Sequence, residues 1–370
     1  MKMNKLISIV MAALLVCSMV VTGCGSRGGN RGNGGADEVE FNGTIDPDSI
    51  PEMTITFAHL DATDPNMQSH GIAVYLQEKL AEFSGGKIKM DIVGGGALGN
   101  ATELLEQVVA GQIEMTNAIT DANLAIIWKD MNVLSVPFAF RSVDQMMDVW
   151  DSSFGDELEA SILEKTGARV AFVCQNGGMR NFTNNVKPIA TPADMKNMKI
   201  RVMDSPAHMA MITALGANPT PIAWTELYTA LQTNVVDGQE NAVPAIVQAN
   251  LYEVQKYMST DGHLASFLFT VVNNDWYNNL NGHAKAAVDQ AFAETEAYAR
   301  TFVAEIADKG MKTLEENGME IHETTAEELK QFQDATVSVK ELIKTTLLDD
   351  PTIMDRFDTA IKESDARLGF

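Results

Sequence analysis

The chain of 370 residues is strongly acidic, with 50 Asp and Glu residues against 27 Lys and Arg residues and a formal net charge of −23. A field of this sign repels nucleic acid, which excludes nucleic-acid binding as the function. The length exceeds what one hydrophobic core usually fills, so we expect two lobes with a cleft between them.

The first residues predict export. Lys2 and Lys5 precede an apolar run over 6–21, which is followed by Thr22-Gly23-Cys24. The run is shorter than the roughly 20 residues of a membrane-spanning helix, and its end resembles the lipobox of a bacterial lipoprotein signal. An ordinary secretory signal that happens to contain a cysteine is the alternative, but it does not explain the glycine-rich tether at 25–35. The expected segments are a signal peptide at 1–23, and a lipidated Cys24 with a flexible tether at 24–50.

The cysteines are Cys17, Cys24 and Cys174. Cleavage of the signal would remove the first and acylation would occupy the second, so Cys174 is left without a partner. This excludes a disulfide framework and a cysteine metal site within one chain.

The first folded block alternates between strand and helix patterns. Residues 53–58 and 87–93 alternate like strands, and a helix pattern covers 68–83. Asn100 and Glu103 have the spacing of a capping box that starts the next helix. This order predicts a parallel sheet covered by helices.

The second block repeats the pattern from about residue 168. Strands are expected at 168–173 and 199–202, with a helix start at Thr191-Pro192 and a helix over 225–233. No solenoid repeat is visible.

Two long amphipathic helices are predicted at 283–317 and 326–348. The first outruns one lobe, so we expect it to span both as a backbone shared across a hinge. The fold class is α/β, a two-lobed periplasmic-binding-protein-like fold with a long interlobe helix. The expected lobes are 51–176 plus 267–306 for lobe I, and 177–266 plus 307–370 for lobe II.

Motifs for catalysis are weak. The run Gly94 to Gly99 satisfies G-x-G-x-x-G between a strand and a helix, but Glu114 and Asp121 are only loosely placed for a ribose acid, and nicotinamide cofactors are scarce outside the cytoplasmic membrane. A glycine-rich turn is the preferred interpretation. The six histidines have neither HExxH spacing nor a G-x-S-x-G elbow. We therefore expect no catalytic residue, metal or cofactor.

Two arginines stand out. Arg180 lies in a polar, glycine-rich segment after an apolar strand, so its side chain is expected at the strand's carboxyl end. Arg201 lies inside a strand between apolar neighbours, where it must find a partner or line a cavity. A bidentate pair with a carboxylate fits either case. An internal salt bridge, the commoner outcome for an isolated arginine in a strand, stays open.

Two residues further along the chain could complete a binding site. Trp224, at a loop-to-helix junction, could form a wall against the apolar part of a ligand or belong to the interlobe core. The Asn241 amide could donate to a carboxylate oxygen or merely brace a turn.

The chain resembles the DctP-type extracytoplasmic solute receptors of tripartite ATP-independent periplasmic (TRAP) transporters. The resemblance covers nearly all of the mature chain and is most specific over 220–241. It is carried by Leu98-Gly99 with 103–108, 136–141, 176–180, 188–201, 226–232, 236–241 and 252–257.

The resemblance implies a role for each candidate. Arg201 matches the family's principal carboxylate-clamping arginine, Arg180 a second basic residue near the ligand, and Asn241 the asparagine that completes the carboxylate contact. Trp224 occupies the position of the aromatic residue that stacks on the ligand. His59 falls where members place a polar first-lobe contact.

The implied function is that of a non-enzymatic receptor. The chain would bind a small organic acid, close around it and deliver it to an ion-gradient-driven permease, from an extracytoplasmic position with a lipid anchor at Cys24. A ligand-binding sensor for a membrane kinase is the alternative, and an extracytoplasmic carboxylate-processing enzyme is less favoured. The ligand itself is not specified by these residues.

Overall fold

The computed structural model describes residues 43–370. The predicted signal peptide, the lipidated Cys24 and most of the tether lie outside the described residues. None of the helices within 43–370 combines the length and the apolar character that a membrane-crossing segment requires.

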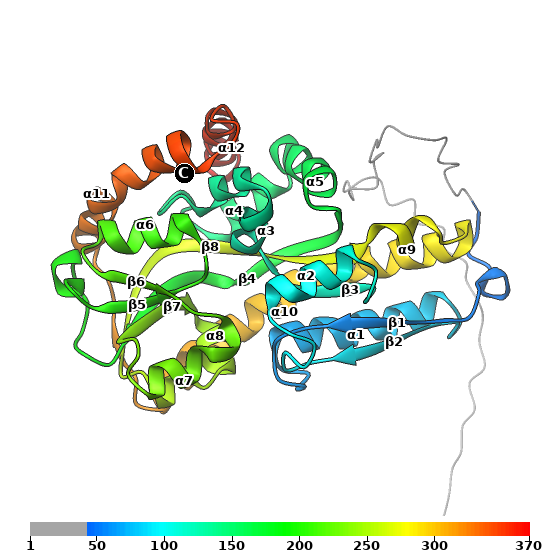
Figure 1. Cartoon of the computed structure of the whole chain (residues 1–370), viewed down its shortest axis with the longest axis horizontal. Coiled ribbons are helices and arrows are strands. Elements are labelled where there is room, and N and C mark those ends of the chain that lie inside the picture. The colour runs from blue at the N-terminus through cyan, green and yellow to red at the C-terminus, as the bar shows by residue number, and fades with distance from the viewer. Residues whose placement is uncertain (1–42) are drawn as a thin grey trace, which may run out of the picture. The chain divides into compact units, whose positions relative to one another are not determined.

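A single mixed sheet of nine strands organises the described part of the chain, in the order β2-β1-β3-β8-β4-β7-β5-β6 with β9 beside β8 (Figure 1). The strands are β1 (Met53–Ala58), β2 (Ile88–Val93), β3 (Met115–Thr120), β4 (Ala168–Asn184), β5 (Lys199–Val202), β6 (Asn218–Pro221), β7 (Gly238–Ala242), β8 (Tyr257–Asn273) and β9 (Glu320–His322). β1 is parallel to β2 and β3, and β5 is parallel to β6 and β7, as expected from the alternation of strands and helices.

Helices cover this sheet. They are α1 (Gln68–Phe83), α2 (Ala101–Val109), α3 (Asp121–Ile127), α4 (Val143–Trp150), α5 (Ser153–Thr166), α6 (Pro206–Ala214), α7 (Leu227–Gln232), α8 (Val243–Gln248), α9 (Asn274–Asn278), α10 (Gly282–Glu316), α11 (Ala326–Leu342) and α12 (Ile353–Leu368). Short 3-10 turns are η1 (Pro47–Ser49), η2 (Lys129–Ser135), η3 (Pro192–Met195), η4 (Trp224–Glu226) and η5 (Leu251–Glu253), and a π-helical turn, η6 (Ile343–Leu347), follows α11.

The two halves of the sheet are joined by the long antiparallel strands β4 and β8. β8 pairs with β3 in the first half, β4 pairs with β7 in the second, and the two long strands pair with each other through both. Their register shifts between Gln175 and Met179, where Gly177 and Gly178 have φ of +80° and +101°. Residues with a side chain rarely adopt these positive φ values, so the two glycines allow β4 to bend from one half of the sheet into the other.

The expected strand at 168–173 is therefore too short. β4 continues through the glycine-rich segment to Asn184 because β8 and then β7 supply backbone partners along it. Arg180 lies inside β4, and the prediction that it emerges at the end of a strand is wrong.

Local signals at two helix starts predicted the structure well. Asn100 and Glu103 form the expected capping box at α2, and Thr191 and Asp194 form another. The second opens only the four-residue turn η3, because the chain must reverse into β5. Asn197, at that reversal, has φ +66°, a conformation that asparagine tolerates better than most residues.

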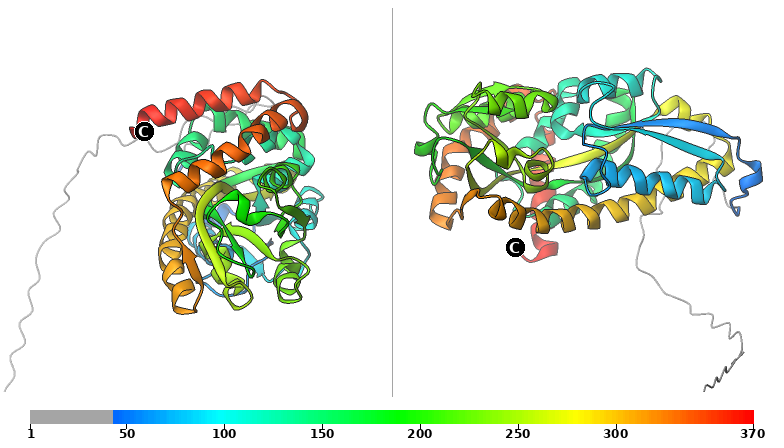
Figure 2. Two further views of the ribbon diagram at one scale, coloured as in Figure 1. Left: turned by 90° about the vertical axis from the view of Figure 1, so that its left-hand side faces the viewer. Right: turned by 90° about the horizontal axis from the view of Figure 1, so that it is seen from below.

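The long helix α10 contacts α1 and β4 at its first part and α8 at its last, as Figures 1 and 2 show. The prediction that one helix spans both lobes is confirmed. The C-terminal helix α12 packs on α4 and α5, so it contacts a segment that was assigned to lobe I. The lobe boundaries themselves stay a prediction.

Candidate functional site

Arg201 is a buried cation that has no carboxylate partner in the described part of the chain. Its side chain in β5 is 2% exposed, and its Nε donates a hydrogen bond of 2.9 Å to the carbonyl oxygen of Ile222. Among residues 43–370 no Asp or Glu forms an ion pair with it. Burial lowers the pKa of the guanidinium to about 10, against a smaller raising effect of Glu240, so the group remains charged at neutral pH. A buried charge of this kind gains stability when an anion reaches it.

Asn241 lies on the same face of the sheet as Arg201. The register pairs Arg201 with Gln239 in β7, and Asn241 is two residues further along that strand. The Asn241 Nδ2 donates to the Gln239 Oε1 at 2.6 Å, and within the described residues nothing donates to its Oδ1. The side chain is buried, so an amide oxygen and a guanidinium share a protected face.

Trp224 begins the turn η4, two residues after the carbonyl that accepts from Arg201. The indole is half-buried and packs against the apolar cluster that includes Leu227 and Leu231. Trp224 is not fully buried, so part of its surface is available for a further contact. Its role in stacking on a ligand stays a prediction.

Arg180 is held by an internal carboxylate. Its Nε donates to Glu240 Oε2 at 2.5 Å, and its Nη2 donates to Glu240 Oε1 at 2.9 Å and to the Glu240 carbonyl oxygen at 2.8 Å. The β4–β7 register pairs Arg180 with Ala242, which places Arg180 and Glu240 on the face opposite Asn241. The Nη1 group donates to none of the described residues. A direct contact between Arg180 and a ligand therefore stays a prediction that rests on this nitrogen.

A buried polar network around Glu240 was not assigned from the sequence. His263 Nδ1 lies 2.5 Å from Asp261 Oδ2, and His263 Nε2 lies 3.3 Å from Glu240 Oε2. Burial would lower the pKa of His263, but the carboxylates of Asp261 and Glu240 outweigh it and raise the pKa to about 9. Burial acts to raise the pKa of Glu240, but Arg180, His208 and His263 hold it well below its usual range. Residue spacing does not reveal this network, because Glu240 and His263 lie in polar stretches of β7 and β8 that come together only in the folded sheet.

His59 follows β1 in the other half of the sheet. It is 1% exposed, and its Nε2 lies 2.9 Å from His70 Nδ1. Burial, together with repulsion from His70, lowers the pKa of His59 to about 4, so the ring is neutral at pH 7. No hydrogen bond of the described chain joins His59 to Arg201 or Asn241, and a role in ligand contact stays a prediction.

The carboxyl ends of parallel strands from the two halves meet between them. Thr120, the last residue of β3, and Met203, which directly follows β5, approach with 3.8 Å between Oγ1 and Sδ. Ligands of α/β proteins bind at such an edge, where the strand order changes direction. Arg201 lies two residues before this contact, and His59 follows β1, the strand beside β3.

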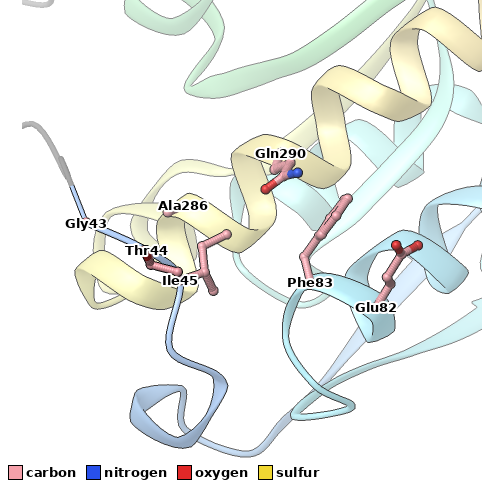
Figure 3. A pocket seen from close by; sticks show the side chains of 7 residues that line it. All are labelled: Gly43, Thr44, Ile45, Glu82, Phe83, Ala286 and Gln290. Atoms are coloured by element: carbon pink, nitrogen blue, oxygen red, sulfur yellow. The ribbon is translucent and has the colours of Figure 1, made fainter. Parts of the chain in front are cut away.

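A surface pocket elsewhere is separate from these residues. It has a volume of about 530 Å³ and lies between the end of α1 and the start of α10 (Figure 3), where its lining includes Ile45, Phe83 and Gln290. None of the predicted site residues lines it. Within the described part of the chain no cluster of His, Cys, Asp and Glu could hold a metal ion. Cys174 is buried, and burial raises the pKa of its thiol to about 12.

Comparison with known proteins decides the family. Residues 58–345 match the family described as bacterial extracellular solute-binding protein, family 7 (DctP). The chain belongs to this family. The resemblance to DctP-type TRAP receptors is thereby confirmed, and with it the two-lobed α/β fold of a periplasmic binding protein.

Curated relatives of this solute-binding protein align over most of their length. The 2,3-diketo-L-gulonate-binding periplasmic protein YiaO of Escherichia coli is 34% identical over 287 residues, which cover 78% of this chain and 85% of the relative. The solute-binding protein RD1_1052 of Roseobacter denitrificans is 34% identical over 270 residues, which cover 72% of this chain and 81% of the relative.

Solved structures show the same fold with sugar acids bound. The sugar acid binding protein of Advenella mimigardefordensis, in complex with galactonate, has a TM-score of 0.80 and 28% identity, covering 85% of this chain and 100% of that chain. A TRAP solute-binding protein of Roseobacter denitrificans with bound β-D-glucuronate has a TM-score of 0.76 and 30% identity, covering 84% and 99%.

Proposed function

We propose that this chain is an extracytoplasmic receptor that binds a sugar acid and delivers it to a TRAP permease. The observation that carries the proposal is the Arg201 guanidinium, which is buried, charged and unpaired with any carboxylate of residues 43–370. The planar guanidinium has free N–H groups suited to a bidentate pair with a ligand carboxylate.

The neighbouring residues support a carboxylate that carries hydroxyl groups. Asn241, on the same face as Arg201, has an amide oxygen that accepts no hydrogen bond from the described residues and can accept one from a hydroxyl group. Trp224 is only partly buried, two residues after the Ile222 carbonyl that accepts from Arg201, and offers an aromatic surface. The relative named for 2,3-diketo-L-gulonate, and the similar structures with galactonate and glucuronate, favour a sugar acid among the organic acids.

Calorimetric titration tests the ligand class. The purified protein is titrated with D-galactonate and D-glucuronate, and with D-galactose as a control without a carboxylate. We expect binding of at least one of the two acids and none of the neutral sugar. Binding of galactose as tightly as of the acids would contradict the proposal.

Two exchanges at position 201 test the clamp. Arg201→Met removes the cation and should weaken acid binding by about 2–5 kcal/mol, the usual cost of removing one member of a desolvated charge pair. Arg201→Lys keeps the charge but loses the planar fork, so it should also weaken binding. Arg367→Met, at a surface arginine paired with Asp148, is the control and should leave affinity unchanged. Unaltered affinity in a folded Arg201→Met variant would refute the assignment.

The membrane anchor is a separate part of the proposal. The lipobox-like residues before Cys24 and the following glycine-rich segment support a thioether-linked lipid that holds the receptor near its permease. Cells fed labelled palmitate should yield a labelled protein, and Cys24→Ala should abolish the label. A labelled Cys24→Ala variant would contradict lipidation at this residue.

A further inference from the structure

The glycine-rich turn from Gly94 to Gly99 has no role in the binding proposed so far. Two of its residues lack a side chain for local reasons. A Cβ on Gly94 would lie 2.6 Å from Cε1 of His59, and one on Gly99 would lie 2.4 Å from Oε2 of Glu103, which caps α2. These glycines let the turn pack against the end of β1 and the start of α2.

Gly96 lacks a side chain for a different reason. A Cβ at this position would lie 3.0 Å from Cγ2 of Thr225 and 3.8 Å from Cδ2 of Leu60. Carbon atoms in contact are normally about 3.5–4.0 Å apart, so a side chain at residue 96 would force Thr225 to move away by a few tenths of an ångström. The Gly96 N–H donates to the His59 carbonyl oxygen at 3.1 Å, which fixes the turn to the end of β1.

Thr225 belongs to the other half of the molecule. It is an exposed residue in the turn η4, directly after Trp224, whereas Gly96 lies between β2 and α2. The approach of Gly96 to Thr225 therefore joins the same two regions as the contact between Thr120 and Met203.

We propose that the turn η4, which carries Trp224, packs against the backbone of Gly96 in the first lobe when the lobes close. This contact controls ligand affinity. The proposal rests on the proposed receptor function and adds a residue pair that determines how far the site can close. A ligand shifts the balance toward a closed form only by its greater affinity for that form. A side chain at residue 96 would hinder only the closure of the lobes, because it does not contact Arg201 or Asn241.

The chain supplies a matched control for the strain of the substitution. Gly95 and Gly96 both have φ +68°, so alanine at either position adopts the same disfavoured φ. A Cβ on Gly95 has nothing within 4 Å, whereas a Cβ on Gly96 meets Thr225. The difference between the two variants therefore isolates the contact between the lobes.

Titration of Gly95→Ala and Gly96→Ala with D-galactonate and D-glucuronate tests the proposal. We expect Gly96→Ala to bind about tenfold more weakly than Gly95→Ala, which corresponds to about 1.4 kcal/mol, while the ligand-free thermal midpoints of the two variants agree. Thr225→Ser removes the Cγ2 atom and should restore affinity in the Gly96→Ala background. Equal affinities of the two alanine variants, or no rescue by Thr225→Ser, would overturn the proposal.

A second measurement needs no ligand, so a failure of the receptor function can be told apart from a failure of this contact. If the parent protein binds neither acid, the sugar-acid proposal fails, and oxidative cross-linking of Gly96→Cys/Thr225→Cys is compared with that of Gly95→Cys/Thr225→Cys. The buried Cys174, with its raised pKa, does not compete for these thiols. Faster cross-linking of the 96–225 pair supports the contact, and equal rates for the two pairs overturn it.

Discussion

Arg180 and Glu240 form a buried ion pair with two hydrogen bonds between their side chains, of 2.5 and 2.9 Å, across the neighbouring strands β4 and β7. Arg201, in the next strand β5, is equally buried but has a backbone carbonyl as its only hydrogen-bonded partner within residues 43–370. One arginine is therefore satisfied by the protein itself, while the other retains the capacity to bind an acid.

This difference predicts that the protein depends on Arg180 for its stability far more than on Arg201. Arg180→Met leaves the Glu240 carboxylate buried without its main partner and should reduce the free energy of unfolding by about 3–5 kcal/mol. Arg201→Met removes a buried charge together with one hydrogen bond, so the two effects oppose each other and we expect a change of less than about 1 kcal/mol. Urea unfolding of both ligand-free variants, followed by circular dichroism, measures this difference.

The control for the ion pair is the double variant Arg180→Met with Glu240→Leu, which removes both charges. Replacing both members of a buried pair by apolar residues is often neutral, so it should recover part of the stability lost in Arg180→Met, although His263 then loses one carboxylate. An Arg201→Met variant that unfolds as readily as Arg180→Met would show that Arg201 has a structural role.

The sequence predicted those features that depend on near neighbours. The capping box of Asn100 and Glu103 and the bounds of α1 follow from side chains within a few residues of each other. The apolar neighbours of Arg201 in its strand predicted that its guanidinium needs a partner or a cavity. The pairing of Arg180 with Glu240 did not, because 60 residues separate them and only the register of β4 with β7 brings them together.

The continuation of β4 was missed for a related physical reason. Gly177 and Gly178 suggest a turn when only local propensity is considered, and they do adopt positive φ. Pairing with β8 up to Gln175 and again from Met179, and with β7 from Arg180, keeps the chain in the sheet on both sides of the glycines. Tertiary hydrogen bonding on both sides overrode the local preference, and β4 runs on from the first half of the sheet into the second.

The raised pKa of His263 predicts that the protein loses stability at alkaline pH. Its pKa is raised from 6.5 to about 9 because Asp261 and Glu240 outweigh the effect of burial. A raised pKa gives stability that is fully present below pH 6.5 and is lost as the pH rises through about 9, by an amount of about 3 kcal/mol. Unfolding free energies measured between pH 6 and 10 should fall in the parent and stay flatter in His263→Gln. His322→Gln, a histidine outside this network, should keep the fall, and a parent curve without it would contradict the prediction.

The lowered pKa of His59 predicts a separate loss of stability at acidic pH. Burial and the neighbouring His70 lower its pKa from 6.5 to about 4, so protonation is disfavoured in the folded state. Stability from this group is present above pH 6.5 and is lost as the pH falls through about 4, by an amount of about 3 kcal/mol. Burial raises the pKa of Asp61 and Asp121, which act in the opposite sense, so the difference between the parent and His59→Gln is the quantity to measure. Parallel curves from pH 7 to pH 4 would contradict the prediction.

A substitution at Gly238 tests how strongly the face that carries Arg201 and Asn241 depends on the close approach of β7 to β4. A Cβ at this position would lie 2.3 Å from the Thr183 carbonyl oxygen and 2.8 Å from the Asn184 Cβ, so Gly238→Ala must push the strands apart. β7 also carries Glu240 and Asn241, which lie on opposite faces of the sheet. We expect a loss of about 1–3 kcal/mol in stability, as for other overpacked sites, together with weaker acid binding.

Gly318→Ala, where the added Cβ meets open space, is the control for the loss of a glycine and should leave affinity unchanged. If Gly238→Ala keeps both the thermal midpoint and the calorimetric affinity of the parent, β7 can shift without disturbing the site, and the fixed alignment of Arg201 with Asn241 is not what determines binding.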